Sequence, residues 1–334
     1  MSSKRDIILL FLLLAFTAGI ALFSLITGDV EIPMKKTLDI LFGGISENPS
    51  WSYIIESRFN RTIAALCGGS ALAVAGLILQ VYFRNPLAGP GVLGITSGAE
   101  LGVAFVILGG SSAMQFFGNP GLILAGILGS FSVLALLLFI SKFIANPVVM
   151  LVLGLMFSAF ISAFINVMLV SADLSSTREY VLWGMGSFEG ITSINLIWMV
   201  CLCLICFIGS LFLIKPMNAL VLGEQYALST GIQLSRVRLL VIFFTGVLSA
   251  VVTVYCGPVS FIGIAVPQLV RMILSSKNHL HHLFACILCG AFLAILSDLV
   301  VRFTAIALPL NTVTALLGAP VIVYTILKLN NRVA

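Results

Sequence analysis

The sequence predicts an all-α polytopic membrane protein with about ten transmembrane helices. Hydrophobic residues fill 60% of the 334 positions and charged residues only 9%, and the mean hydropathy is +1.19. Soluble domains carry about 25% charged residues, so this chain lacks the polar residues needed to cover a water-facing surface. A spanning helix needs about 20 apolar residues, which leaves room for about ten spans joined by short loops. We therefore expect a single transmembrane domain over residues 1–334, embedded in the lipid bilayer.

Ten apolar runs, separated by polar or Gly- and Pro-containing segments, mark the expected spans. The first run is too long for the apolar part of a signal peptide and lacks a small-residue cleavage site, so we expect it to remain as a span. The third and eighth runs are short and are flanked by Gly and Pro. The expected spans are 7–27, 60–83, 92–108, 120–141, 147–170, 193–214, 237–255, 260–274, 282–303 and 311–328.

The distribution of Lys and Arg between the loops predicts the orientation, because cytoplasmic loops are enriched in these residues. With the N-terminus in the cytoplasm, eleven Lys and Arg residues lie inside and six lie outside. Both termini are then cytoplasmic, which agrees with an even number of spans. The net charge of +5 is small and scattered, so no nucleic-acid partner is expected.

Three arginines on the expected outer side stand against this rule, namely Arg58, Arg61 and Arg302. Arginines near the ends of spanning helices commonly extend to the lipid headgroups. Together they could also form a docking surface for the carboxylates of an external partner, because a guanidinium group binds a carboxylate through two parallel hydrogen bonds.

An internal similarity suggests two inverted halves of five spans, about 1–170 and 171–334. In each half a basic start leads into a small-residue-rich helix, a Gly/Pro break and a short span, and the two copies begin on opposite sides, which is a common transporter arrangement. Broken helices at membrane depth are tolerated inside the protein or beside a water-filled path, although ordinary turns and helix packing on small residues are an equal alternative. The candidate pathway or broken-helix residues are Asn85, Pro86, Gly89, Pro90, Gly94, Gly257, Pro258, Gly263 and Pro267.

Enzyme and metal chemistry find little support in the sequence. Cys201, Cys203 and Cys206 have no His or acidic residue near them, so we expect packed thiols and no metal site. No Lys follows a Gly, which excludes the phosphate-binding loop of an ATPase, and no catalytic constellation is found within the spans. We expect no catalytic residue and no cofactor bound by this chain.

Five motifs carry a resemblance to a known family, and they occur in the order found in that family. The chain resembles the ABC importer permeases for iron–siderophore, haem and cobalamin, which are FecCD-like or cobalamin-permease-like. The motifs are RFNR at 58–61, RNPLAGPGVLGITSG at 84–98, LGEQYALSTG at 222–231, GPVSFIGIAVPQLVR at 257–271 and TALLGAP at 314–320.

The resemblance implies the fold of a type II ABC importer permease and the function of a pore-forming subunit for a bulky metal chelate. Iron(III)–siderophore is the expected cargo, with haem and cobalamin as alternatives. The implied partners are two cytoplasmic ATPase subunits that hold the ATP, a periplasmic or lipid-anchored binding protein, and a second permease subunit, most simply in a homodimer. The implied location is the bacterial inner membrane. In such a family, arginines that match Arg58, Arg61 and Arg302 pair with acidic residues on the binding protein.

The resemblance also assigns the polar segment 216–236 to the contact with the ATPase. Residues 220–228 are expected to form a short amphipathic helix with Glu224 exposed. The coupling residues implied by the family motif are Leu220, Leu222, Gly223, Glu224, Ala227 and Gly231.

Two residues depart from the family pattern, and a third weakens one assignment. Gln268 replaces the His or similar residue usual before the final Leu-Val-Arg, and Glu100 stands where small or apolar residues are usual. Asp298 and Arg302 are four residues apart on one helix and can neutralise each other, which makes Arg302 the weakest docking residue.

The main alternative function is a secondary transporter driven by an ion gradient. Such a transporter needs buried acids or His residues along an ion route. Glu100 and Asp298 are the available acids, and His279, His281 and His282 are expected in a cytoplasmic loop.

Overall fold

The computed structural model describes residues 2–28, 30–44, 48–109, 111–144, 146–276, 278–304 and 308–330. Within this part of the chain all regular structure is helical. The elements are α1 (Ser2–Ile26), α2 (Met34–Leu41), α3 (Pro49–Tyr82), η1 (Pro90–Leu93), α4 (Ile95–Ile107), α5 (Ser111–Ile140), α6 (Pro147–Ser171), α7 (Leu174–Gly184), α8 (Ser193–Leu211), α9 (Ile214–Leu222), α10 (Glu224–Ser229), α11 (Leu234–Cys256), α12 (Ile262–Ile273), α13 (His279–Phe303) and α14 (Leu310–Asn330).

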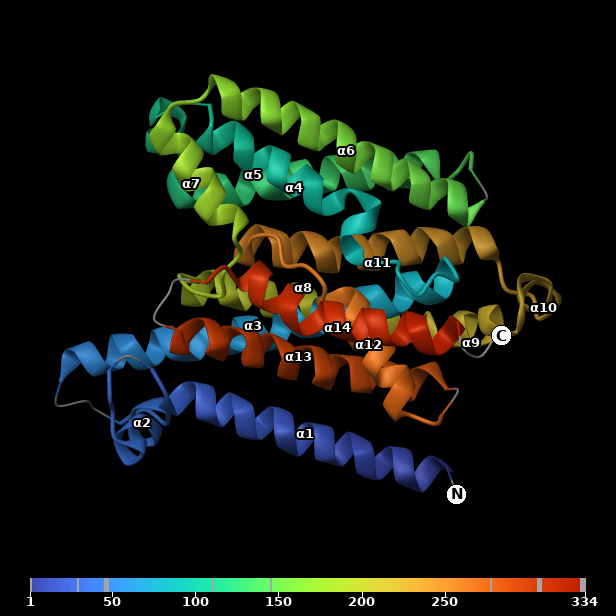
Figure 1. Ribbon diagram of the computed structural model, residues 1–334, viewed down its shortest axis with the longest axis horizontal. Helices are drawn as coiled ribbons and strands as arrows, with labels where there is room; N and C mark the ends of the chain where they lie inside the picture. Colours follow the sequence, from blue (N-terminus) through green and yellow to red (C-terminus); the bar gives the residue numbers. More distant parts are fainter. Residues whose placement is uncertain are drawn as a thin grey trace.

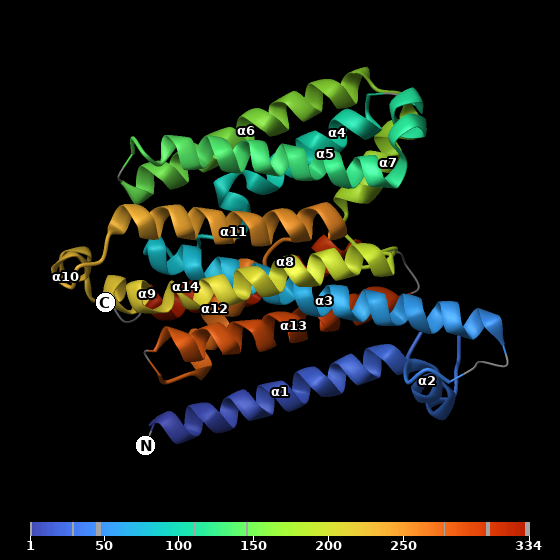
Figure 2. The ribbon, with the colours of Figure 1, turned by 180° about the vertical axis from the view of Figure 1, so that it is seen from behind.

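The long helices lie side by side along one common direction (Figures 1 and 2). The start of α1, the far end of α14 and the short helix α10 gather at one end of the bundle, and α2 and α7 lie at the other. The helix α3 runs through the centre and packs against α11, α12 and α13. The two ends of the bundle therefore carry different short helices, which distinguishes the two expected sides of the membrane.

All ten expected spans correspond to helices. Seven of the described helices are long and apolar enough to cross a membrane, and three shorter apolar helices, Ile95–Ile107, Ile262–Ile273 and Leu310–Thr325, account for the remaining spans. The short third and eighth spans are confirmed as α4 and α12, which have 13 and 12 residues.

Two sequence-based expectations about local structure are wrong. Residues 220–228 do not form one helix, because Gly223 adopts a φ of 131° and separates α9 from α10. The three histidines expected in a loop lie in the first turn of α13, where the side chain of Asn278 accepts a hydrogen bond from the backbone N–H of Leu280 at 3.0 Å. Because Asn278 caps the helix, α13 begins at His279, before the apolar run that predicted a span from residue 282.

Small residues let the central helices approach very closely. A Cβ atom added at Gly76 of α3 would lie 1.7 Å from the carbonyl oxygen of Gly263 in α12, and one added at Gly69 would lie 2.2 Å from that of Gly290 in α13. Close backbone approach through small residues is the usual basis of helix packing in a membrane, where lipid removes much of the hydrophobic drive for association. The small residues of α3 therefore make it the packing centre of the bundle.

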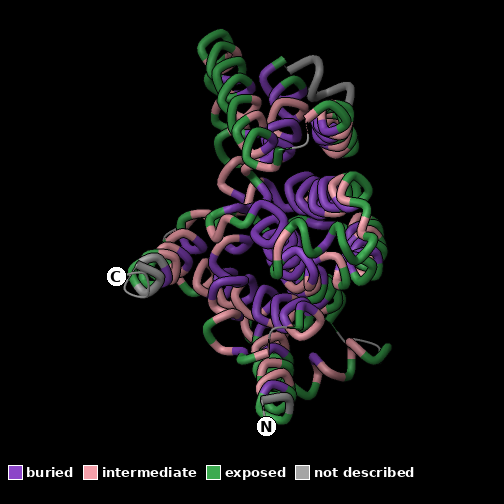
Figure 3. The backbone as a smooth tube through the Cα atoms, turned by 90° about the vertical axis from the view of Figure 1, so that its right-hand side faces the viewer, coloured by how far each residue is buried: buried purple, intermediate pink, exposed green. Residues whose placement is uncertain are grey.

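The outer helices present apolar side chains away from the bundle. Phe11 of α1, Phe160 of α6 and Trp198 of α8 are all more than 60% exposed. The exposed residues concentrate on the outer helices and the buried ones on the central helices (Figure 3). This distribution suits a protein whose surrounding solvent is lipid.

Candidate functional site

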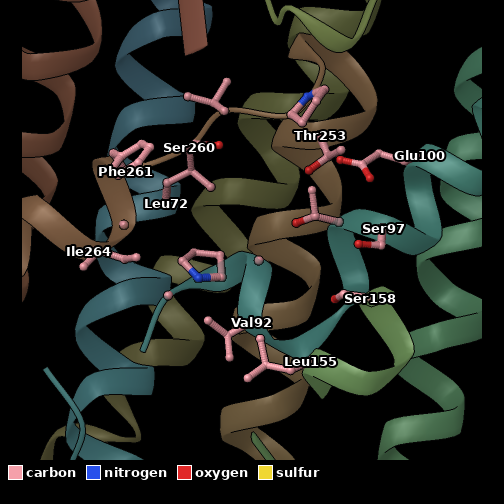
Figure 4. Close-up of a pocket in the computed structure, with 17 residues that line it drawn as sticks. Leu72, Val92, Ser97, Glu100, Leu155, Ser158, Thr253, Ser260, Phe261 and Ile264 are labelled. Atoms are coloured by element: carbon pink, nitrogen blue, oxygen red, sulfur yellow. The ribbon is translucent and has the colours of Figure 1, made fainter. Parts of the chain in front are cut away.

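A cavity of about 410 Å³ lies where the two broken segments meet. Its walls come from α3, η1, α4, α6, α11 and the start of α12 (Figure 4). The lining residues are Leu72, Gly89, Pro90, Gly91, Val92, Thr96, Ser97, Glu100, Leu155, Ser158, Thr253, Pro258, Val259, Ser260, Phe261, Gly263 and Ile264. Segments from both expected halves of the chain thus surround one space.

The two breaks contact each other directly. A Cβ atom at Gly263 would lie 2.5 Å from the Cδ of Pro90, and one at Gly89 would lie 2.6 Å from the Cγ1 of Ile264. Phe261, at the start of α12, adopts a φ of 65°, which is strained for a bulky residue. Because glycine has no side chain, the two breaks can pack directly against each other at these contacts and form part of the cavity wall.

The structure divides the nine broken-helix residues into two groups. Gly89, Pro90, Pro258 and Gly263 line the cavity. The others support it from outside: Gly94 and Gly257 provide turns with φ values of 76° and 71°, Pro267 is buried inside α12, and Asn85 and Pro86 follow the end of α3.

The unusual Gln268 holds one break in place. Its Nε2 donates to Oε1 of Gln80 at 2.9 Å and to the backbone oxygen of Pro86 at 2.8 Å. The Nε2 of Gln80 donates in turn to the backbone oxygen of Ile264 at 3.1 Å. This buried pair gives hydrogen bonds to the carbonyl group of Pro86, which lies outside regular helix, and to that of Ile264 in the first turn of α12. The sequence showed Gln268 as a departure, but its partner 188 residues away was not readable.

Glu100 projects toward the cavity from α4, near Ser97 and Thr253 (Figure 4). The residue is half-buried, and among the described residues its carboxylate has neither a hydrogen bond nor an ion pair. Burial first, and then the charge of Glu100, raise the pKa of the Tyr180 phenol in α7, which places that ring close to Glu100.

A separate cluster of charges lies where α3 begins and α13 ends. Asp298 Oδ2 is 2.6 Å from Arg302 Nη2, and Asp298 Oδ1 is 2.9 Å from Arg61 Nε. Arg61 Nη1 also contacts Glu189 Oε2 at 2.9 Å. The expected pairing of Asp298 with Arg302 is confirmed. The sequence did not show that Asp298 also binds Arg61, because the two residues are 237 positions apart.

Arg58 is the most enclosed of the three outer arginines. Its guanidinium group donates to the backbone oxygens of Ile26 at 3.1 Å and of Val30, and the side chain is buried. All three arginines nevertheless line one cavity of about 330 Å³, together with Tyr53 and Glu189. We call this space the arginine pocket; it lies at the same end of the bundle as α2 and α7.

The opposite end carries α9 and α10, joined at Gly223. Leu220 and Ala227 are buried and fix the two short helices to the bundle, whereas Leu222 is 68% exposed and Glu224 is exposed. Gly223 and Gly231 both have positive φ values, which suit glycine. The exposed position expected for Glu224 is confirmed, and an apolar side chain lies beside it on the surface. In Figure 1 α10 protrudes from the end of the bundle.

The family model for the FecCD transport family matches residues 12–328, which is nearly the whole chain. The chain belongs to the FecCD transport family. The resemblance read from the five motifs is therefore confirmed, and so is the expected multi-pass permease fold.

Individual FecCD proteins are similar over most of their length. The vitamin B12 import system permease protein BtuC of Klebsiella pneumoniae is 32% identical, covering 99% of this chain and 96% of its own. The molybdate import system permease protein MolB of Haemophilus influenzae is 35% identical, with 83% and 81% covered. A solved inward-facing structure, assigned to a metal-chelate type ABC transporter, superposes with a TM-score of 0.83 at 30% identity, covering 96% of this chain and 99% of that one.

Among the described residues, no three His, Cys, Asp or Glu side chains group as metal ligands. The site consists of a cavity with one carboxylate between two breaks, with the arginine pocket at one end of the bundle and α9 and α10 at the other.

Proposed function

We propose that this chain is the pore-forming permease subunit of an ATP-driven importer for a bulky metal chelate. Iron(III)–siderophore is the first candidate cargo, and haem and cobalamin are the others. The observation that carries the proposal is the cavity at the meeting point of the two breaks, between the arginine pocket at one end of the bundle and α9 with the protruding α10 at the other. Membership of a family with a vitamin B12 permease supports this cargo class.

In the proposed mechanism the arginine pocket receives a binding protein on the outer side. Arg61 already binds two carboxylates, and it can exchange the exposed Glu189 for an acidic side chain of the partner while Asp298 keeps it in place. Glu189 is 67% exposed in its side chain, so releasing it costs little. The pocket thus serves as a preorganised docking site for carboxylates.

On the inner side, α9 and α10 provide the contact with an ATPase subunit. An exposed Leu222 beside an acid is a suitable anchor for insertion into a cleft of the partner. ATP-driven closure of two ATPase subunits would move α9 and α10 and, through α11, the cavity wall, so that the cavity opens alternately to each side. A second copy of the permease would complete the path, and both termini would lie in the cytoplasm of the bacterial cell, at the inner membrane.

The alternative of an ion-driven transporter gains little from the arrangement of the acids. Asp298 is neutralised by Arg61 and Arg302, which leaves Glu100 as the acid in the cavity. Transporters that couple to protons or sodium generally rely on chains of such groups.

Reconstitution into liposomes with and without the ATPase subunits tests the two mechanisms. We expect uptake of a radiolabelled ferric chelate or cobalamin only when the ATPase subunits, the binding protein and ATP are all present. Uptake without the ATPase that stops when the ion gradient is removed would refute the importer and favour the secondary transporter.

A further inference from the structure

The cavity between the breaks has one acidic side chain among the residues that line it, and no basic one. Of the residues that line it, Glu100 is ionisable as an acid and none is Lys or Arg. No hydrogen bond or ion pair joins Glu100 to the part of the chain that the structure describes. An acid in a membrane span is costly unless water or a partner solvates it. The Glu100 carboxylate therefore faces the cavity with its acceptor atoms available.

The neighbouring hydroxyl groups also offer acceptors. Thr253 donates its proton to the backbone oxygen of Ser249 at 2.9 Å, and Ser158 donates to that of Gly154 at 3.1 Å. A hydroxyl that donates within its own helix presents its remaining lone pairs outward. Two hydroxyl oxygens in the wall of the cavity are thus available as acceptors near the Glu100 carboxylate, and Thr253 lies beside it (Figure 4).

We propose that Glu100 determines the charge of the cargo, so that this path admits chelates that are cationic, or neutral with N–H or O–H donors at their rim, and disfavours oxyanions and anionic chelates. This inference rests on the proposed function, because it assumes that the cargo passes through the cavity. A cavity of this kind selects among chelates of similar size by their charge. An amine-bearing hydroxamate chelate or neutral cobalamin is compatible with it. Haem, which carries two carboxylates, and molybdate are not. When the dielectric constant lies between that of water and that of the protein interior, a unit charge several ångströms away changes the local concentration of a second unit charge by about fivefold.

The potential in the cavity can be measured without any cargo. Ser97 lies one turn before Glu100 and also lines the cavity, and Ser260 lines it and is exposed. In the reconstituted permease, Ser97→Cys and Ser260→Cys are modified with a trimethylammonium and a sulfonate methanethiosulfonate reagent, after subtraction of the reaction of the native cysteines. We expect Glu100→Gln to lower the ratio of the cationic to the anionic rate by about tenfold at residue 97, and less at residue 260.

Two matched variants make this measurement specific. Glu100→Asp keeps the charge and should keep the ratio. Glu179→Gln removes an exposed acid of α7 outside the cavity lining and should leave the ratio unchanged. An unchanged ratio in Glu100→Gln, at residue 260 if residue 97 proves unreactive, would overturn the proposal, because it would show that the carboxyl group carries no charge or does not face the cavity.

A second measurement connects the charge to transport. The probes are the ferric complex of a linear trihydroxamate with a free amine and the same complex with that amine succinylated, which differ mainly in charge, together with cobalamin. Uptake by the complete importer is normalised to the affinity of the binding protein for each probe. We expect Glu100→Gln to raise the uptake of the succinylated chelate relative to the amine form by about fivefold, and an unchanged relative uptake would contradict a role in selection. If no probe enters with ATP, the proposed function fails, while the reagent ratio still decides the role of Glu100.

Discussion

At the scale of single residues, Asp298 is the centre of the charge cluster at the arginine pocket. It is nearly fully buried and neutralises two arginines that come from different helices, Arg61 of α3 and Arg302 of α13. Buried ion pairs contribute little when intact, because desolvation offsets their attraction, but removing one partner leaves an uncompensated charge. Asp298 thus fixes the position of both arginines at the rim of the arginine pocket.

The first prediction concerns the stability that depends on this carboxylate. Asp298→Asn should lower the free energy of unfolding by about 3 kcal/mol, because Arg61 and Arg302 lose their shared buried counter-ion. Glu189→Gln is the control, since the exposed Glu189 pair should contribute less than about 1 kcal/mol. Thermal unfolding in detergent measures both. Equal midpoints for the two variants would show that Asp298 is not the counter-ion of the arginines.

The second prediction concerns docking by Arg61. Charge reversal is a poor choice here, because a Glu at position 61 would face Asp298. Arg61→Gln keeps a hydrogen-bonding side chain, and it should weaken binding-protein capture by about tenfold or more at moderate salt, as expected for loss of a charged hydrogen bond at an interface. Unchanged capture by a folded Arg61→Gln protein would argue against docking at this pocket.

Sequence reasoning identified these arginines but not the network that holds them. The spacing of Asp298 and Arg302 along one helix was visible, because residues four apart share a face. The contacts of Asp298 with Arg61 and of Gln268 with Gln80 join residues that are about 200 positions apart, and they depend on helix packing that no local pattern encodes. Glu100 was noticed because an acid within an apolar run is costly.

At the scale of elements, the contact of α3 with α12 determines the position of the second break. The backbones of these helices approach so closely at Gly76 and Gly263 that no side chain can be accommodated between them. Pro90 of η1 packs against the same Gly263, so one glycine serves both the helix contact and the cavity wall. Packing of α3 therefore also positions the cavity.

The third prediction tests this contact. Gly76→Ala should destabilise the protein by at least about 1–3 kcal/mol, because the added methyl group forces α3 and α12 apart. Gly19→Ala in α1 is the matched control: nothing lies within 4 Å of its added Cβ, so the substitution should be neutral or slightly stabilising. Melting temperatures in detergent distinguish the two. A Gly76→Ala protein as stable as the control would contradict the close contact.

The spans, including the short helices α4 and α12, were predictable from apolar runs, whereas the short helices outside the spans were not. The helices α2 and α7 are short and partly polar, so they resemble loops in a hydropathy reading. Residues 220–228 have an amphipathic pattern, but the positive φ of Gly223 divides them. A glycine is compatible with both conformations, and the tertiary contacts of Leu220 and Ala227 decide between them.

At the scale of the whole molecule, the cavity lies between two surfaces at opposite ends of the bundle. The arginine pocket lies at the end with α2 and α7, and α9 and α10 at the other (Figure 1). The helix α11 starts close to the α10 end and ends at the second break, so it connects that end of the bundle directly with the cavity wall. A displacement of α10 has a continuous packed route to Thr253.

The fourth prediction follows from this connection. Leu222→Ala and Glu224→Lys should uncouple ATP hydrolysis from transport, because the exposed Leu222 is expected to anchor the ATPase and Glu224 borders it. Loss of an interface anchor of this kind costs about 2 kcal/mol, so the number of chelates imported per ATP should fall by about thirtyfold while hydrolysis in the assembled complex continues. Ser171→Ala, exposed at the end of α6 and outside residues 216–236, is the control and should transport normally. Phosphate release and uptake are measured in parallel in proteoliposomes. A normal number of chelates imported per ATP in both variants would show that α9 and α10 do not couple hydrolysis to transport.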